Sequence, residues 1–201
     1  MLRSALARLF WTFSRWRLVT EPAPTRPTVL IGAPHTSNWD FVVMLAIAWR
    51  LRVPMRWLGK DSLFRGWRGP IMRRLGGIPV DRANPAGIVD EVVARVHSGE
   101  VFGLVVTPEG TRGSGKYWKS GFYRIARATG MPITLGYVDI TTRTAGLGLT
   151  FEPTGDVRAD MDIVRAFYAD KAGIRPEFRT EARLREEDDP GASDAPVIVA
   201  E

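Results

Sequence analysis

Apolar runs alternate with amphipathic stretches along the chain, and this pattern predicts strands that alternate with helices. Short apolar runs typical of buried strands occupy residues 28–33, 55–59, 77–81, 101–107, 132–140 and 146–153. Stretches with helical spacing or helix-capping residues occupy residues 38–52, 62–76, 84–99, 119–130 and 161–173, the second of them interrupted at Pro70. Strands separated by helices of this length predict an α/β fold, a single domain with a mostly parallel sheet flanked by helices.

The first 18 residues predict an additional, amphipathic helix. Large apolar residues recur there at spacings of three and four, and arginines fall largely between them. The positions expected to face a membrane interface are Leu6, Phe10, Phe13 and Trp16. Arginine combined with such side chains is typical of a helix that lies in a membrane interface, whereas a helix docked on the protein's own core is the alternative. The segment predicts a monotopic or peripheral association with a membrane surface.

Charge is unevenly distributed along the chain, whose net charge is +6. Residues 1–82 carry 14 Arg and Lys against 4 Asp and Glu, and a basic half of this kind suits nucleic acid, anionic lipid or a phosphorylated substrate. Residues 181–201 carry 2 against 7 and contain proline and glycine, which predicts a disordered tail. We therefore expect an interface helix at 1–19, a folded domain at 20–180 and an acidic tail at 181–201.

The composition excludes several kinds of chemistry. The chain has no cysteine, so thiolate metal sites and cysteine nucleophiles are excluded. With only two histidines, a zinc site would need carboxylates for most of its ligands, and we expect no metal. The longest apolar run, residues 41–49, is far short of the roughly 20 residues of a spanning helix, and the N-terminus lacks the features of a signal peptide. We expect a protein on the cytoplasmic face of the cell membrane.

His35 lies just after a predicted strand and just before a predicted helix, where open α/β sheets bind ligands. Its neighbourhood has two interpretations. Ser37 and Asp40 have the spacing of a capping box, in which the carboxylate only accepts a backbone N–H and complements the helix dipole. Alternatively, Asp40 holds the proton on one nitrogen of His35 so that the other nitrogen acts as a base. The two roles are compatible, because a carboxylate in the first helical turn can face the preceding loop.

A second cluster of polar residues follows the predicted strand at 101–107. It consists of Glu109, Gly110, Thr111 and Arg112. These residues place a carboxylate, a hydroxyl and a guanidinium in one loop, and the arginine can bind a phosphate through two hydrogen bonds. Residues 110–116 also match the first seven positions of a phosphate loop, but the eighth residue is Tyr117 instead of the serine or threonine that holds Mg²⁺. This departure argues against nucleotide hydrolysis.

Basic residues also follow two other predicted strands. Arg82 comes directly after the strand at 77–81, and Lys60 comes directly after the strand at 55–59. Arginines between them alternate with Phe64 and Trp67, a mixture found in surfaces that bind nucleic acid or lipid. No recognised nucleic-acid-binding motif is present in the sequence, so we expect no nucleic-acid partner. The sequence also lacks the G-x-S-x-G motif of serine esterases.

Together and in this order, the blocks resemble the glycerolipid acyltransferase family, whose best-known members acylate lysophosphatidic acid. The segment "HTSNWD" matches the family's H-x-x-x-x-D motif, with His35 and Asp40 at its ends. The segments "LGGIPVDR", "TPEGTR" and "GMPITLGY" match the second, third and fourth blocks. The resemblance spans about residues 28 to 140, and it departs from the family at Thr107, where phenylalanine is usual. It implies an acyltransferase domain that needs no metal and no other cofactor.

The resemblance implies a role for each matching residue. His35 would be the general base that takes the proton of an acceptor hydroxyl as that hydroxyl attacks an acyl thioester, on CoA or acyl carrier protein, and Asp40 would orient it. The residues that would bind a phosphorylated acceptor are Lys60, Arg82, Glu109, Gly110, Thr111 and Arg112. The expected reaction converts the lysophospholipid 1-acyl-glycerol-3-phosphate into phosphatidic acid without a covalent intermediate.

Three other functions remain compatible with the sequence. The acceptor of such an acyltransferase could be another lysophospholipid, a glycolipid or an aminolipid. A non-catalytic protein could bind anionic lipid or nucleic acid through the basic half, with an affinity that falls steeply with salt. A thioesterase would admit water where the acceptor hydroxyl would otherwise bind.

Overall fold

The computed structural model describes residues 2–80, 85–109 and 115–188. In this part of the chain, seven strands form one sheet in the order β1-β7-β6-β2-β5-β3-β4. The strands are β1 (Arg17–Leu18), β2 (Thr28–Ala33), β3 (Met55–Lys60), β4 (Gly77–Val80), β5 (Gly103–Val106), β6 (Ile133–Asp139) and β7 (Thr144–Phe151). Neighbouring strands are parallel except for β6 and β7, which are antiparallel. The predicted α/β fold with a mostly parallel sheet is therefore confirmed.

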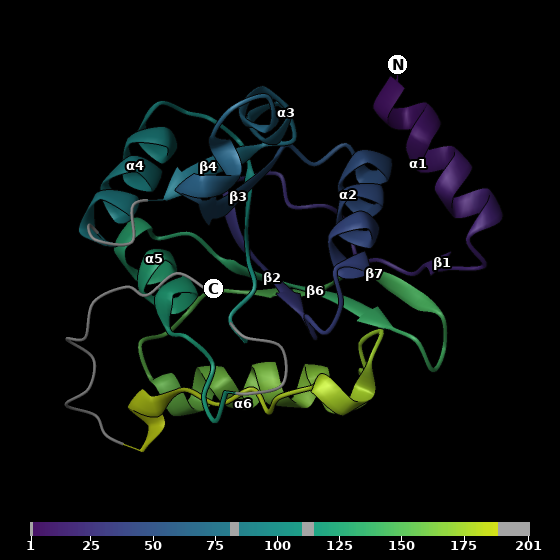
Figure 1. Cartoon of the computed structure of the whole chain (residues 1–201). Helices are drawn as coiled ribbons and strands as arrows, with labels where there is room; N and C mark the ends of the chain where they lie inside the picture. Colours follow the sequence, from purple (N-terminus) through teal and green to yellow (C-terminus); the bar gives the residue numbers. More distant parts are fainter. Residues whose placement is uncertain (1, 81–84, 110–114, 189–201) are drawn as a thin grey trace.

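Helices cover both faces of the sheet. The α-helices are α1 (Leu2–Phe13), α2 (Trp39–Leu51), α3 (Arg68–Arg74), α4 (Pro85–His97), α5 (Gly121–Thr129) and α6 (Val157–Tyr168). Short 3₁₀ turns are η1 (Asp61–Phe64), η2 (Pro176–Phe178) and η3 (Arg185–Glu187). Figure 1 shows α1 beside α2 on one side of the sheet and α6 on the opposite side. Among the described residues, no helix is long and apolar enough to cross a membrane.

The central strand β2 contributes side chains to a hydrophobic core on each face. Val29 and Ile31 belong to the core beneath α4, α5 and α6, whereas Leu30 belongs to the core beneath α2. All three side chains are buried, and a continuous apolar run is what a parallel strand covered on both faces requires. Because β2 lies between β5 and β6, the loop that follows it emerges at the centre of the sheet edge where the parallel strands end.

The N-terminal helix is shorter than the pattern predicts. Helix α1 ends at Phe13, and Arg15 has a left-handed backbone with φ of 59°. The next residues turn into β1, which pairs with β7 through Arg17 and Leu18. Trp16 continues the helical spacing of apolar residues, but it lies outside the helix because this pairing takes the backbone into the sheet.

Two other expectations need correction. The helical stretch at 62–76 breaks at residues 65–67, between η1 and α3, and Pro70 lies in the first turn of α3, where proline is tolerated. The folded domain also continues beyond residue 180. Ala182 and Leu184 are buried, and Leu184 forms a β-bridge with Trp118, so the apolar residues among the acidic ones hold residues 181–188 on the domain. The remainder of the expected tail, 189–201, lies outside the described residues.

Candidate active site

The loop between β2 and α2 brings His35 and Asp40 together. The Nδ1 atom of His35 lies 3.5 Å from the Oδ2 atom of Asp40. The same Oδ2 atom accepts hydrogen bonds from the backbone N–H groups of Thr36 and Ser37, each at 2.6 Å. Asp40 is buried in the first turn of α2, where the helix dipole favours a negative charge. The carboxylate thus fixes the loop and faces the histidine at once.

This geometry is compatible with both interpretations of the motif. The N-cap of α2 is Asn38 and not Ser37, so the predicted capping box does not form as such. Asp40 nevertheless accepts the N–H of Ser37, and the Ser37 hydroxyl accepts the N–H of Trp39 at 3.2 Å. Capping therefore places the carboxylate where it meets the imidazole. A histidine whose Nδ1 proton faces a carboxylate has its Nε2 lone pair available as a base. The His35 side chain is 20% exposed, so solvent or a substrate can reach it.

Glu109 connects the loop after β5 to the loop that carries His35. Its Oε1 atom accepts the backbone N–H of His35 at 3.1 Å, and the residue is 2% exposed. The other oxygen, Oε2, is buried and has no hydrogen-bond partner among the described residues. Burial raises the pKa of the Glu109 carboxyl from 4.5 to about 7; the His35 N–H opposes this shift, and the charge of Asp40 adds to it.

This raised pKa makes stability depend on pH. Between pH 4.5 and about 7, the Glu109 carboxyl keeps its proton in the folded protein and loses it in the unfolded protein. The stabilisation that the protonated carboxyl provides is therefore fully present below pH 4.5 and is lost as the pH rises through about 7. We expect the free energy of unfolding of the wild type to fall by up to about 3 kcal/mol over this range relative to Glu109→Gln. Urea unfolding at several pH values measures this difference, with the exposed Glu177→Gln as control. The prediction would be contradicted if the free energies of unfolding of the wild type and of Glu109→Gln changed with pH in parallel.

An apolar pocket begins at the histidine and runs beneath α2. His35 and Asp40 lie at one end, and Val53 and Met55 lie at the other. The walls between them come from β2, β5, β6 and β7 on one side and from α2 on the other, including Leu30, Val105, Val138, Leu147, Phe41, Met44 and Ile47. The cavity volume is about 80 Å³, which makes the pocket narrow. A narrow apolar pocket suits an unbranched apolar chain with its polar end at His35.

A segment near the C-terminal end of the domain also holds the His35 loop. The Thr36 hydroxyl accepts the backbone N–H groups of Ile174 and Arg175, at 3.1 and 2.9 Å. Gly173 pairs with the end of β6, and a Cβ at this position would lie 2.9 Å from the Thr36 hydroxyl. In the sequence, only Gly173 marks this contact with the His35 loop. Thr36 is therefore not among the predicted site residues.

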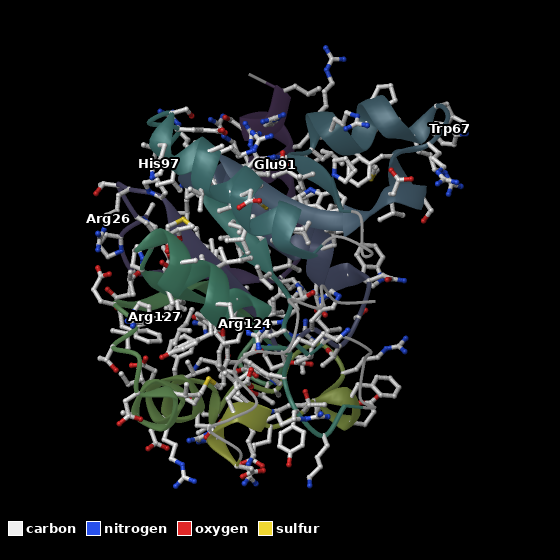
Figure 2. The ribbon with its side chains drawn as sticks, turned by 90° about the vertical axis from the view of Figure 1, so that its left-hand side faces the viewer. Arg26, Trp67, Glu91, His97, Arg124 and Arg127 are labelled. Carbon is white, nitrogen blue, oxygen red and sulfur yellow. The ribbon has the colours of Figure 1, made fainter. Side chains whose placement is uncertain are left out.

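The structure does not describe the side chains of several predicted site residues. Arg82, Gly110, Thr111 and Arg112 lie outside the described residues. Lys60 ends β3, and its backbone therefore lies at the same sheet edge as His35. Among the described residues, no group of three His, Asp or Glu side chains is arranged to hold a metal ion. The other histidine, His97, is exposed at the end of α4 (Figure 2).

The four predicted membrane-interface residues divide into two pairs. Leu6 and Phe13 are 43% and 75% exposed. Phe10 and Trp16 are half-buried and pack against the core beneath α2. Helix α1 therefore docks on the domain through one side and presents apolar side chains on the other.

Comparisons with known proteins concern the family and the fold of the chain. A protein-family model described as Acyltransferase matches residues 17–135. The crystal structure of the 1-acyl-sn-glycerophosphate acyltransferase PlsC from Thermotoga maritima is similar in fold, with a TM-score of 0.59 and 16% sequence identity. The similarity covers 84% of this chain and 77% of that one. No curated protein shows significant sequence similarity to the chain.

Proposed function

The chain belongs to the acyltransferase family, and we propose that it moves an acyl group from a thioester donor, on CoA or acyl carrier protein, to the hydroxyl of a lysophospholipid. The proposed acceptor is 1-acyl-glycerol-3-phosphate, and the product is phosphatidic acid. The observation that carries this proposal is the position of the His35–Asp40 pair at the mouth of the apolar pocket. That arrangement places a base beside the spot where the carbonyl of a buried acyl chain would lie.

In the proposed mechanism, His35 acts as a general base. Its Nε2 atom accepts the proton of the acceptor hydroxyl while the hydroxyl oxygen attacks the thioester carbonyl. Asp40 holds the Nδ1 proton and stabilises the imidazolium that forms. The tetrahedral intermediate then collapses, the carbon–sulfur bond breaks, and the imidazolium returns its proton to the leaving thiolate. No covalent bond to the protein forms in this sequence of steps.

Glu109 takes a positioning role in this proposal. It is buried and binds the His35 backbone, so it fixes the loop that presents the base. By family resemblance, the acceptor site also includes Gly110 and Thr111, and recognition of the acceptor phosphate is assigned to Arg82 and Arg112, with Lys60 assisting. Arginine suits this task because its planar guanidinium matches two phosphate oxygens at once.

We place the enzyme on the cytoplasmic face of the cell membrane, as a peripheral or monotopic protein. Support comes from the exposed apolar side of α1, where Leu2 and Phe13 are 73% and 75% exposed. Trp67, between η1 and α3, is 75% exposed and projects from the surface (Figure 2). Large apolar side chains among arginines suit the boundary between headgroups and acyl chains, where a lysophospholipid is found.

The pocket predicts that a large residue at position 32 impairs every acyl donor. Gly32 lines the pocket next to His35, and an added Cβ would lie 3.7 Å from Thr107 and Val105, an ordinary contact. Gly32→Leu fills the end of the pocket that a short chain must enter as well as a long one, so we expect kcat/KM for hexanoyl-CoA and for palmitoyl-CoA each to fall at least about tenfold. Gly32→Ala, which adds only the Cβ, is the matched control. Wild-type kcat/KM of Gly32→Leu for either donor would contradict a chain-binding pocket.

Acceptor-dependent thiol release tests the proposed function. The protein has no cysteine, so a colorimetric thiol reagent reports only the CoA released from acyl-CoA. We expect release with 1-acyl-glycerol-3-phosphate and little release without an acceptor. A panel of other lysophospholipids, a glycolipid and an aminolipid identifies a different acceptor. Release that is independent of every acceptor would support a thioesterase, and no release from any acyl-CoA or acyl carrier protein would contradict an acyltransferase.

A further inference from the structure

A threonine in the His35 loop links the base to the C-terminal part of the domain. Thr36 follows His35 directly and is 1% exposed. Its backbone N–H donates to the Asp40 Oδ2 atom at 2.6 Å, the same atom that faces the imidazole. Its hydroxyl accepts the backbone N–H groups of Ile174 and Arg175, at 3.1 and 2.9 Å. One side chain therefore joins the base to a segment that lies 138 positions further along the chain.

This segment is itself fixed to the central sheet. Gly173 forms a parallel β-bridge with Asp139 at the end of β6. The Gly173 N–H donates to the carbonyl of Val138, and the Gly173 carbonyl accepts the N–H of Ile140, each at 3.1 Å. The N–H of Ala172 donates to the buried Asp139 carboxylate at 3.2 Å. Because β6 pairs with β2 and β7, the sheet determines where the segment presents its N–H groups to Thr36.

The segment and the His35 loop also approach each other closely. Gly173 has a left-handed backbone with φ of 73°. A Cβ at this position would lie 2.9 Å from the Thr36 hydroxyl oxygen, 3.0 Å from the Thr36 methyl carbon and 3.1 Å from the Pro34 Cβ. On the other side, Ile174 packs against the core beneath α2. Thr36 is therefore held by close packing as well as by its hydrogen bonds.

The position of the loop decides whether the base is oriented. The His35 Nδ1 atom lies 3.5 Å from Asp40, beyond the usual range of an N–H···O hydrogen bond, so a shift of a few tenths of an ångström strengthens or removes the contact. A catalytic group has to be held within about 0.5 Å of its working position by the residues around it. Three described contacts hold this loop, and they are made by Asp40, by Glu109 and by the Thr36 hydroxyl. The third reaches residues 174 and 175, outside the part of the chain that the family model matches.

We propose that Thr36 is a positioning residue for His35 and that residues 173–175 belong to the active site through it. By accepting two N–H groups, the hydroxyl holds the loop so that the Nδ1 proton of His35 faces Asp40. The effect on catalysis rests on the proposed function, in which His35 is the base, whereas the orientation of the imidazole requires no reaction. If the hydroxyl served only to hold the C-terminal segment, its loss would leave the imidazole unchanged.

The tautomer of His35 tests the proposal in the absence of any substrate. Long-range ¹H–¹⁵N NMR spectra distinguish a proton on Nδ1 from a proton on Nε2, and the chain has only two histidines, so the His35→Ala spectrum assigns the signals. Spectra are recorded at about pH 8.5, well above the ordinary histidine pKa of about 6.5. We expect the Nδ1–H form in the wild type and in Thr36→Ser, and a mixture of both forms in Thr36→Val. Valine keeps the shape of the side chain and removes the acceptor, and His97 serves as an internal reference.

Steady-state kinetics of the same variants measure the effect on acyl transfer. Thr36 is not among the residues that line the pocket. We therefore expect Thr36→Val to lower kcat at least about tenfold while KM for acyl-CoA changes less than about twofold, and Thr36→Ser to retain kcat within about twofold. Thr28→Val is the matched control, because Thr28 is equally buried at the start of β2 and its hydroxyl donates to the carbonyl of Pro132 at 3.0 Å. This control should keep both kcat and the His35 spectrum.

A folded Thr36→Val protein with the Nδ1–H form and wild-type kcat would overturn the proposal, as would equal losses in Thr36→Val and Thr36→Ser. Thr36→Ala is a second variant without the hydroxyl. If neither variant folds while Thr28→Val does, the hydroxyl serves the fold alone and the proposal is rejected. A tautomer that depends on Thr36 in a protein without acyl transfer would reject the proposed function and keep the positioning role. Acyl transfer that needs His35 but not the Thr36 hydroxyl would reject only the positioning role.

Discussion

Replacement of His35 by alanine is expected to lower kcat for acyl transfer by about 10²- to 10⁴-fold, the usual contribution of a positioned general base. Alanine removes the imidazole that faces Asp40 at the mouth of the pocket and leaves the backbone N–H that Glu109 binds. The fold should therefore persist, and KM for the donor should change little, because the pocket walls stay intact. Steady-state thiol release measures both constants.

The second histidine provides a matched control for this variant. His97 is exposed at the end of α4, away from the pocket, so His97→Ala should retain wild-type kcat. Circular dichroism and thermal unfolding of both variants show whether any loss reflects misfolding. A folded His35→Ala protein with wild-type kcat would refute the assigned base.

The second large effect is expected for Asp40→Asn. Asparagine keeps an oxygen that can accept the N–H groups of Thr36 and Ser37, but it has no negative charge to orient and stabilise a protonated His35. We expect kcat to fall by about 10²-fold or more, comparable with the loss of base catalysis, while the α2 N-terminus stays folded. The same thiol-release assay measures it.

Comparison with Asp40→Ala separates the two roles of this carboxylate. Alanine also removes the acceptor for two loop N–H groups and should lower the free energy of unfolding by about 1–3 kcal/mol relative to asparagine. Asp162→Asn, 74% exposed on α6, controls for the loss of a surface charge. Wild-type kcat in Asp40→Asn would show that the carboxylate only caps the helix.

The sequence predicts the elements that carry the base well, because their patterns are local. Strand β2 has the predicted bounds, and α2 begins at Trp39, next to the predicted start at residue 38. The pairing of His35 with Asp40 follows from the same local pattern, since a carboxylate in the first turn of a helix lies close to the preceding loop.

Contacts between distant segments could not be predicted in this way. Strand β1 consists of two residues and exists only because β7 offers an edge to Arg17 and Leu18. The support of Thr36 by residues 174 and 175 depends on how α6 returns the chain to the end of β6. The pocket beneath α2 arises between elements, so no single segment encodes its depth.

The burial of Leu184 shows the same limit at the end of the domain. Composition marks residues 181–201 as acidic, and in a prediction from sequence this signal outweighs the apolar residues Ala182 and Leu184. In the folded protein these apolar side chains are buried, and Glu187 caps its own turn by accepting the N–H of Leu184 at 2.7 Å. Packing against the domain therefore decides the structure of residues 181–188.

Identification of the product tests the central claim most directly. The wild-type protein is incubated with isotope-labelled palmitoyl-CoA and 1-acyl-glycerol-3-phosphate, and the lipids are analysed by mass spectrometry. We predict phosphatidic acid that carries the labelled chain, in an amount equal to the CoA released, and a loss of this product in His35→Ala. Labelled free fatty acid in its place, or equal product from wild type and His35→Ala, would contradict acyl transfer by this histidine.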